Sequence, residues 1–113
     1  MLRASGQHDN RTYTLAGVTG GATGTGVAGG AEMLALADAA LGRDDLALTG
    51  VRHAVVAALG AEALVDAAAV IGGFDGITRI ADATGIPLEP AKAEQTADFF
   101  AELALGRFRM EKV

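Results

Sequence analysis

Residues 61–83 constrain the fold of this chain more than any other segment. Small and apolar side chains recur there every three or four residues, which places them on one stripe of a long α-helix: Leu64, Ala67, Ala68, Ile71, Phe74, Ile77, Thr78 and Ala81. Gly85 and Pro87 follow, and these residue types end helices. The pattern predicts one helix over 61–83 with a buried stripe along it.

Two glycines, Gly72 and Gly73, interrupt the middle of this predicted helix. Each costs roughly 1 kcal/mol relative to alanine in a helix interior. Because glycine lets two backbones come close together, we expect another helix to approach the chain at this point.

Two further helices are predicted before residue 61. The first begins near Ala31 and ends at Gly42, a residue type suited to the C-terminus of a helix. The second can be capped by Asp44 or Asp45, whose side chains can accept hydrogen bonds from the first turn. Gly60 ends this second helix.

A fourth helix is predicted from Pro90 through about residue 105, because proline is tolerated in a first helical turn. The expected fold class is therefore all-α, a small bundle of about four helices that occupies residues 31–106. Residues 107–113 are expected to form a charged tail.

The N-terminal segment 1–30 has a different composition. It holds eight of the 16 glycines of the chain, and half of residues 19–30 are glycine. Ordering so many glycines costs backbone entropy, so we expect a flexible arm and linker. Within it, residues 13–18 are expected to form a short strand or an extended arm.

The glycine-rich segment contains Gly24-x-Gly26-x-x-Gly29, a pattern that can cradle a pyrophosphate at the start of a helix. Such a loop needs a preceding strand and repeated βαβ units, and this chain is predicted to be helical after the loop. We therefore interpret the segment as a linker, with nucleotide binding as a distant alternative.

Composition excludes several classes of function. The net charge of −5 and the scattered Lys and Arg residues argue against a nucleic-acid surface. The chain has no cysteine, which removes disulfides and thiolate chemistry. Its two histidines, His8 and His53, are not at ligand spacing, so no metal site or cofactor is expected.

No apolar run reaches the roughly 18 residues that a membrane span needs, and the N-terminus lacks a signal peptide's apolar centre. A cytoplasmic protein is the expectation. Much of the apolar content is alanine, which buries little surface per residue. We therefore expect these slim helices to gain core by forming a homo-oligomer.

Three side chains are candidates for a ligand site or an interface. Asp75 and Arg79 are four residues apart on one helical face, flanked by Phe74, Ile77 and Ile80. An intrahelical ion pair is the simplest interpretation; if the flanking residues cover it, the pair could orient a ligand or reach another subunit. His53 is the third candidate, although a half-exposed helical histidine is its simplest interpretation.

The chain also resembles a known family over about residues 45–88. The resemblance is strongest over Phe74-Asp75-x-Ile77-x-Arg79-Ile80-Ala81-Asp82-x-x-Gly85-Ile86-Pro87. This run is similar to the Phe-Asn/Asp-x-x-x-Arg-x-Ala-Asp-x-x-Gly-x-Pro segment of the alkylhydroperoxidase D-like, or carboxymuconolactone decarboxylase-like, helical family.

The resemblance implies an all-helical fold that assembles as dimers, trimers or hexamers. Redox members of the family use a Glu, a Cys-x-x-Cys pair and a His. No residue of this chain matches either cysteine, and no other side chain supplies a comparable nucleophile. Thiol peroxidase activity is therefore not expected.

The leading functional expectation is a non-redox protein of this type, acting as an oligomeric scaffold or small-molecule-binding protein. The alternative is a cofactor-free enzyme of the carboxymuconolactone decarboxylase type, with a site between subunits built from His53, Asp75 and Arg79. A closed pocket that receives His53 or Arg79 would favour the enzyme. Exposed or ion-paired side chains would favour the scaffold.

Overall fold

Five helices make up most of the described part of the molecule. The computed structural model describes residues 7–14, 18, 25–87 and 89–104. Its helices are α2 (Gly30–Leu41), α3 (Asp45–Leu59), α4 (Ala61–Thr84), α5 (Pro90–Gln95) and α6 (Ala97–Glu102). No strand occurs in these residues, so the all-α fold class is confirmed. Across the same residues, no helix combines the length and apolar character that a bilayer crossing requires.

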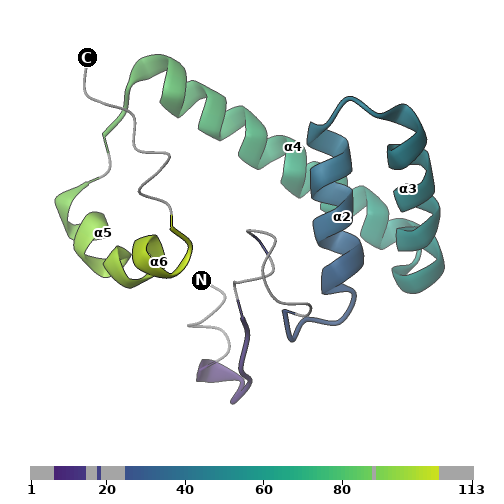
Figure 1. Cartoon of the computed structure of the whole chain (residues 1–113), viewed down its shortest axis with the longest axis horizontal. Helices are drawn as coiled ribbons and strands as arrows, with labels where there is room; N and C mark the ends of the chain where they lie inside the picture. The colour runs from purple at the N-terminus through teal and green to yellow at the C-terminus, as the bar shows by residue number, and fades with distance from the viewer. Residues whose placement is uncertain (1–6, 15–17, 19–24, 88, 105–113) are drawn as a thin grey trace.

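The helices form two groups that α4 connects. Helices α2 and α3 lie side by side, and α4 packs against both of them. Figure 1 shows α4 crossing behind this pair and continuing well past it, toward the end of the molecule where α5 and α6 lie. Helix α5 packs mainly against α6. Few described residues from other helices therefore neighbour the C-terminal half of α4.

Local hydrogen bonds explain where α3 begins. Asp44 adopts an extended conformation immediately before the helix. Its Oδ1 accepts hydrogen bonds from the backbone N–H groups of Leu46 and Ala47, each at 3.0 Å. These bonds satisfy donors that the first turn of a helix leaves unpaired. The predicted cap is confirmed, and Asp44 rather than Asp45 provides it.

The end of α4 is also confirmed at the predicted residue. Gly85 has the left-handed conformation, with φ of 66°, which glycine adopts without steric cost. The N–H of Ile86 donates to the carbonyl of Ala81 at 3.1 Å, and the N–H of Gly85 donates to the carbonyl of Asp82 at 3.3 Å. This pair of bonds is a Schellman motif.

The predicted fourth helix is broken in two. Thr96, with φ of −112° and ψ of 7°, separates α5 from α6. Its Oγ1 donates a hydrogen bond of 2.7 Å to the carbonyl of Lys92. The backbone leaves helical geometry at Thr96, so the single helix predicted from Pro90 onward is wrong at this residue.

Part of the predicted linker belongs to the folded body. Residues 19–24 lie outside the described part of the chain, but residues 25–30 form a turn that leads into α2. Thr25 is 9% exposed, its Oγ1 accepts from the N–H of Val27 at 3.2 Å, and its carbonyl accepts from the N–H of Thr14 at 3.1 Å. Residues 25–30 therefore form a hydrogen-bonded turn next to α2, and the expected flexibility of the linker stays a prediction.

The core is small. Among the described large apolar residues, Leu36 on α2 and Val55 on α3 are buried, at 2% and 0% exposure. Helix α4 has 24 residues and no buried one. The buried stripe predicted along residues 61–83 is therefore wrong for this helix: Leu64, Ala67, Ile71 and Ala81 are half-buried, while Ala68, Phe74, Ile77 and Thr78 are exposed.

Candidate functional site

The Asp75–Arg79 pair exists as predicted. The Nε group of Arg79 donates a hydrogen bond of 2.8 Å to Oδ2 of Asp75, one turn earlier on α4. The side chain of Arg79 is 74% exposed and that of Asp75 is 32% exposed. The hydrogen bond and the charge of Asp75 raise the pKa of Arg79, so the guanidinium stays cationic.

The residues that flank this pair do not cover it. Phe74, Ile77 and Ile80 are 59%, 64% and 62% exposed, and they lie on another side of α4 because successive helical residues turn by about 100°. The expectation that these side chains bury the pair is wrong within one chain. Asp75 is half-buried instead by its position facing α2 and α3.

His53 does not join this pair. It lies on α3 and is exposed. His8, the other histidine, is exposed as well, in the N-terminal segment. General acid–base catalysis needs a positioned group within hydrogen-bond reach of the reacting atoms. The three candidate side chains therefore form one ion pair and one separate histidine, with no shared pocket.

A groove between α2, α3 and α4 includes Asp75 in its lining. It has a volume of about 500 Å³ and is lined by Leu36, Ala40, Leu41, Leu48, Arg52, Leu64, Val65, Ala68, Ile71, Gly72 and Asp75. Nine of these residues are apolar or glycine, and two can be charged. The volume falls within the range usual for small-molecule sites.

The two polar residues of the groove differ in their electrostatic state. Asp75 is already paired with Arg79, so its charge is largely compensated. Arg52 comes from α3 and forms no ion pair with any described residue. The groove therefore offers an apolar surface with one cation at its edge, Arg52, which pairs with no described acidic residue.

Sequence reasoning missed this role of Arg52. The groove forms because α4 packs against both α2 and α3, and such contacts between distant segments are not visible in local periodicity. The only available signal was that Arg52 follows Val51 and is one turn after Leu48 on the apolar side of its helix.

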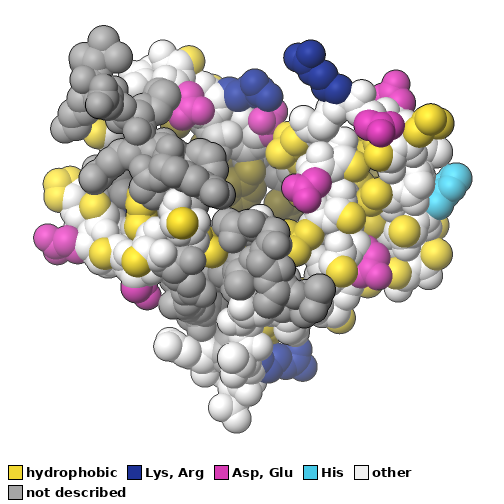
Figure 2. Space-filling view, viewed as in Figure 1, with side chains coloured by type: hydrophobic (Ala, Val, Ile, Leu, Met, Phe, Trp, Pro, Cys, Tyr) yellow, Lys and Arg dark blue, Asp and Glu magenta, His cyan; other side chains and the backbone are white. Residues whose placement is uncertain are grey.

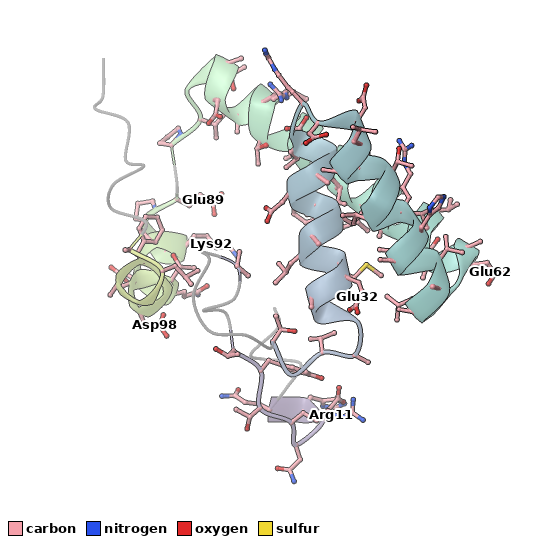
Figure 3. All side chains as sticks on the ribbon, turned by 45° about the vertical axis from the view of Figure 1, so that its right-hand side comes forward. Arg11, Glu32, Glu62, Glu89, Lys92 and Asp98 are labelled. Carbon is pink, nitrogen blue, oxygen red and sulfur yellow. The ribbon has the colours of Figure 1, made fainter. Side chains whose placement is uncertain are left out.

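The described acidic residues do not gather into a metal site. Figure 3 shows the labelled carboxylates Glu32, Glu62, Glu89 and Asp98 on four different elements, without convergence. No group of three or more His, Asp or Glu residues suited to a metal ion occurs in the described part of the chain.

The described glycines of the Gly24-x-Gly26-x-x-Gly29 pattern serve the fold. Gly26 and Gly29 have positive φ angles of 78° and 68°. A Cβ atom at Gly26 would lie 2.7 Å from the backbone oxygen of Thr12, and one at Gly29 would lie 2.5 Å from Cδ1 of Leu59. These glycines let the turn before α2 pack against its neighbours. Gly24 lies outside the described residues.

Comparison with known proteins added no relative: no family model, no curated protein and no solved structure matched the chain.

Proposed function

We propose that this protein is a helical scaffold that assembles from copies of itself and binds a small, mostly apolar molecule in the α2–α3–α4 groove. We also propose that it is an alkylhydroperoxidase D-like protein without a redox centre. The residues that carry this resemblance form the C-terminal half of α4 and the Schellman motif after it.

The observation that carries the proposal is an apolar groove lined by neither Arg79 nor His53; of the three candidate groups only Asp75 lines it, and Asp75 is paired with Arg79. Arg79 is exposed and paired with Asp75, and His53 is exposed on α3. An enzyme of the decarboxylase type needs such groups at a shared, water-poor site. The groove instead carries mainly aliphatic side chains, which suits binding more than proton transfer.

The charge of Arg52 defines the class of ligand further. An apolar molecule with one anionic group would place its apolar part against the residues from α2 and α4 and its anion near Arg52. The carboxylate of Asp75 does not oppose this arrangement strongly, because Arg79 compensates its charge.

Two related fluorescent probes test the proposal: 1-anilinonaphthalene-8-sulfonate, and N-phenyl-1-naphthylamine, which lacks the sulfonate. We expect saturable binding of both probes. Arg52→Gln should weaken binding of the sulfonate about tenfold, an effect typical of one charge-assisted contact, and should leave binding of the neutral probe nearly unchanged.

A matched pair of substitutions locates the binding site. Ala68 lines the groove, and Ala57 is an exposed alanine on α3 that is not among the groove residues. Ala68→Phe should fill the groove and reduce binding of both probes, whereas Ala57→Phe should not. Equal binding by the two variants, or probe binding that never saturates, would contradict the proposal.

A further inference from the structure

The C-terminal half of α4 carries an exposed apolar face. We call it the α4 stripe and define it by residues that recur every three or four positions: Val70, Gly73, Phe74, Ile77, Ile80 and Thr84. Val70, Phe74, Ile77 and Ile80 are 59%, 59%, 64% and 62% exposed. This spacing forms one continuous seam along a helix, as in helices that pair with another helix.

The stripe contains no charged residue. At about 100° per residue, the charged side chains of this half of α4, Asp75, Arg79 and Asp82, point to the other side of the helix. The ion pair therefore does not interrupt the stripe, and two identical stripes would meet without charge repulsion.

Nothing in the described chain fills the space around the glycines of this half. A Cβ atom placed at Gly72, Gly73 or Gly76 would find no neighbouring atom within 4 Å. The close approach expected from Gly72 and Gly73 is therefore not made by another described helix of the same chain. The recess at Gly73 lies within the α4 stripe beside Phe74 and Ile77, whereas Gly72 lines the α2–α3–α4 groove.

The whole molecule has more surface than a compact chain of its size. Its accessible surface is 8762 Å², whereas a compact monomer of 11.3 kDa exposes about 5,700 Å². The radius of gyration is 15.8 Å, against about 13 Å for a compact domain of this length. Figure 2 shows apolar side chains spread over the visible surface of the α2–α3 half as well.

We propose that the α4 stripe is the contact surface for a second copy of this chain, with the two α4 helices antiparallel about a two-fold axis between Gly76 and Ile77. This inference rests on the self-association proposed above and specifies its surface. Such an axis places Ile80 of one copy opposite Gly73 of the other, and Ile77 of one copy beside Ile77 of the other. Large side chains then enter the recesses left by glycines on both sides of the axis, which is the self-complementarity that a symmetric dimer requires.

Disulfide trapping tests this register, because the natural chain has no cysteine. Ile77→Cys should link to itself upon oxidation. Gly73→Cys alone and Ile80→Cys alone should not form a disulfide. In the antiparallel arrangement, each of these positions is offset by seven residues from the same position in the second copy, which is about 10 Å along the helix axis. This separation exceeds the roughly 7 Å limit between the Cα atoms of a disulfide. A mixture of the Gly73→Cys and Ile80→Cys proteins should form the linked dimer. Ala57→Cys, on the exposed surface of α3, is the matched control and should stay unlinked.

Ile77→Asp provides an independent measurement. Ile77 is 64% exposed in the single chain, so the substitution should leave helical content by circular dichroism unchanged. It should raise the dissociation constant of the dimer about 100-fold or more, because two unpaired carboxylates would be buried at the axis. Ala57→Asp should have no such effect.

Several results would overturn the proposal. Self-linking of Gly73→Cys would show parallel helices. If the natural chain associates but Ile77→Cys does not form a disulfide, the self-association would stand and the α4 stripe would be rejected as its contact surface. A monomeric chain in which the stripe is shielded would indicate that another part of the same chain covers it, and would reject both the surface and the self-association. Probe binding in the groove is measured separately and does not depend on either result.

Discussion

Arg79 donates a hydrogen bond of 2.8 Å from Nε to Oδ2 of Asp75, one turn before it on α4, and its side chain remains 74% exposed. This hydrogen bond lies on a different side of α4 from the exposed apolar side chains of Phe74, Ile77 and Ile80. The pair is thus a solvated feature of the polar side of α4, and its partner carboxylate lies at the edge of the α2–α3–α4 groove.

Arg79→Ala should change the thermal midpoint very little, because exposed ion pairs contribute weakly and are screened by salt. The large loss expected from a buried pair does not apply to this geometry. Thermal denaturation followed by circular dichroism, at low and high salt, would measure the effect. A marked fall in the midpoint that persists at high salt would mean that the pair is buried in the assembled protein.

The pH dependence of the thermal midpoint provides a second test of Arg79→Ala. The pKa of Arg79 is raised in the folded chain by its hydrogen bond to Asp75 and by the charge of that carboxylate. Stabilisation from such a group is complete below the ordinary pKa of arginine and is lost only as the pH rises through the higher folded-state value. The difference in midpoint between the natural chain and Arg79→Ala should therefore stay constant between about pH 7 and pH 10.

Gly29→Ala should destabilise the fold by at least about 1 kcal/mol, because alanine is strained in the left-handed conformation and its Cβ would collide with Leu59. Gly50→Ala is the control. Gly50 lies within α3, where a Cβ atom meets nothing within 4 Å, so alanine should stabilise the helix by up to about 1 kcal/mol. Urea denaturation of both variants measures the two changes. Equal stability would mean that the turn before α2 does not pack in solution as it does here.

Asp44→Ala should lower the free energy of unfolding by about 1 kcal/mol, the usual loss for a helix N-cap. The matched control is Asp45→Ala, which keeps the two hydrogen bonds from Leu46 and Ala47 to Asp44 and should lose only a few tenths of a kcal/mol through the helix dipole. Urea denaturation distinguishes the two. A larger loss for Asp45→Ala than for Asp44→Ala would contradict the assigned cap.

The sequence was sufficient to predict features that depend on a few neighbouring residues. The helix ends at Gly42, Gly60 and Gly85 and a cap at Asp44 or Asp45 follow from local backbone preferences; the structure has these helix ends and selects Asp44 as the cap. The spacing of Asp75 and Arg79 likewise predicted their ion pair.

Features that depend on distant contacts could not be predicted in the same way. Periodicity showed that Phe74 and Ile77 belong to an apolar helix, but it does not tell whether the chain supplies another element to cover them. The groove at Arg52 requires the packing of three helices.

We propose that the apolar face of α4, which the described residues leave largely exposed, makes the single chain an incomplete folding unit that pairs with its own copy. Sedimentation equilibrium of the natural chain over a range of micromolar concentrations tests it most directly. We expect a species of twice the 11.3-kDa chain mass, and dissociation of that species by Ile77→Asp but not by Ala57→Asp. A folded species of single-chain mass across the whole range would contradict the claim.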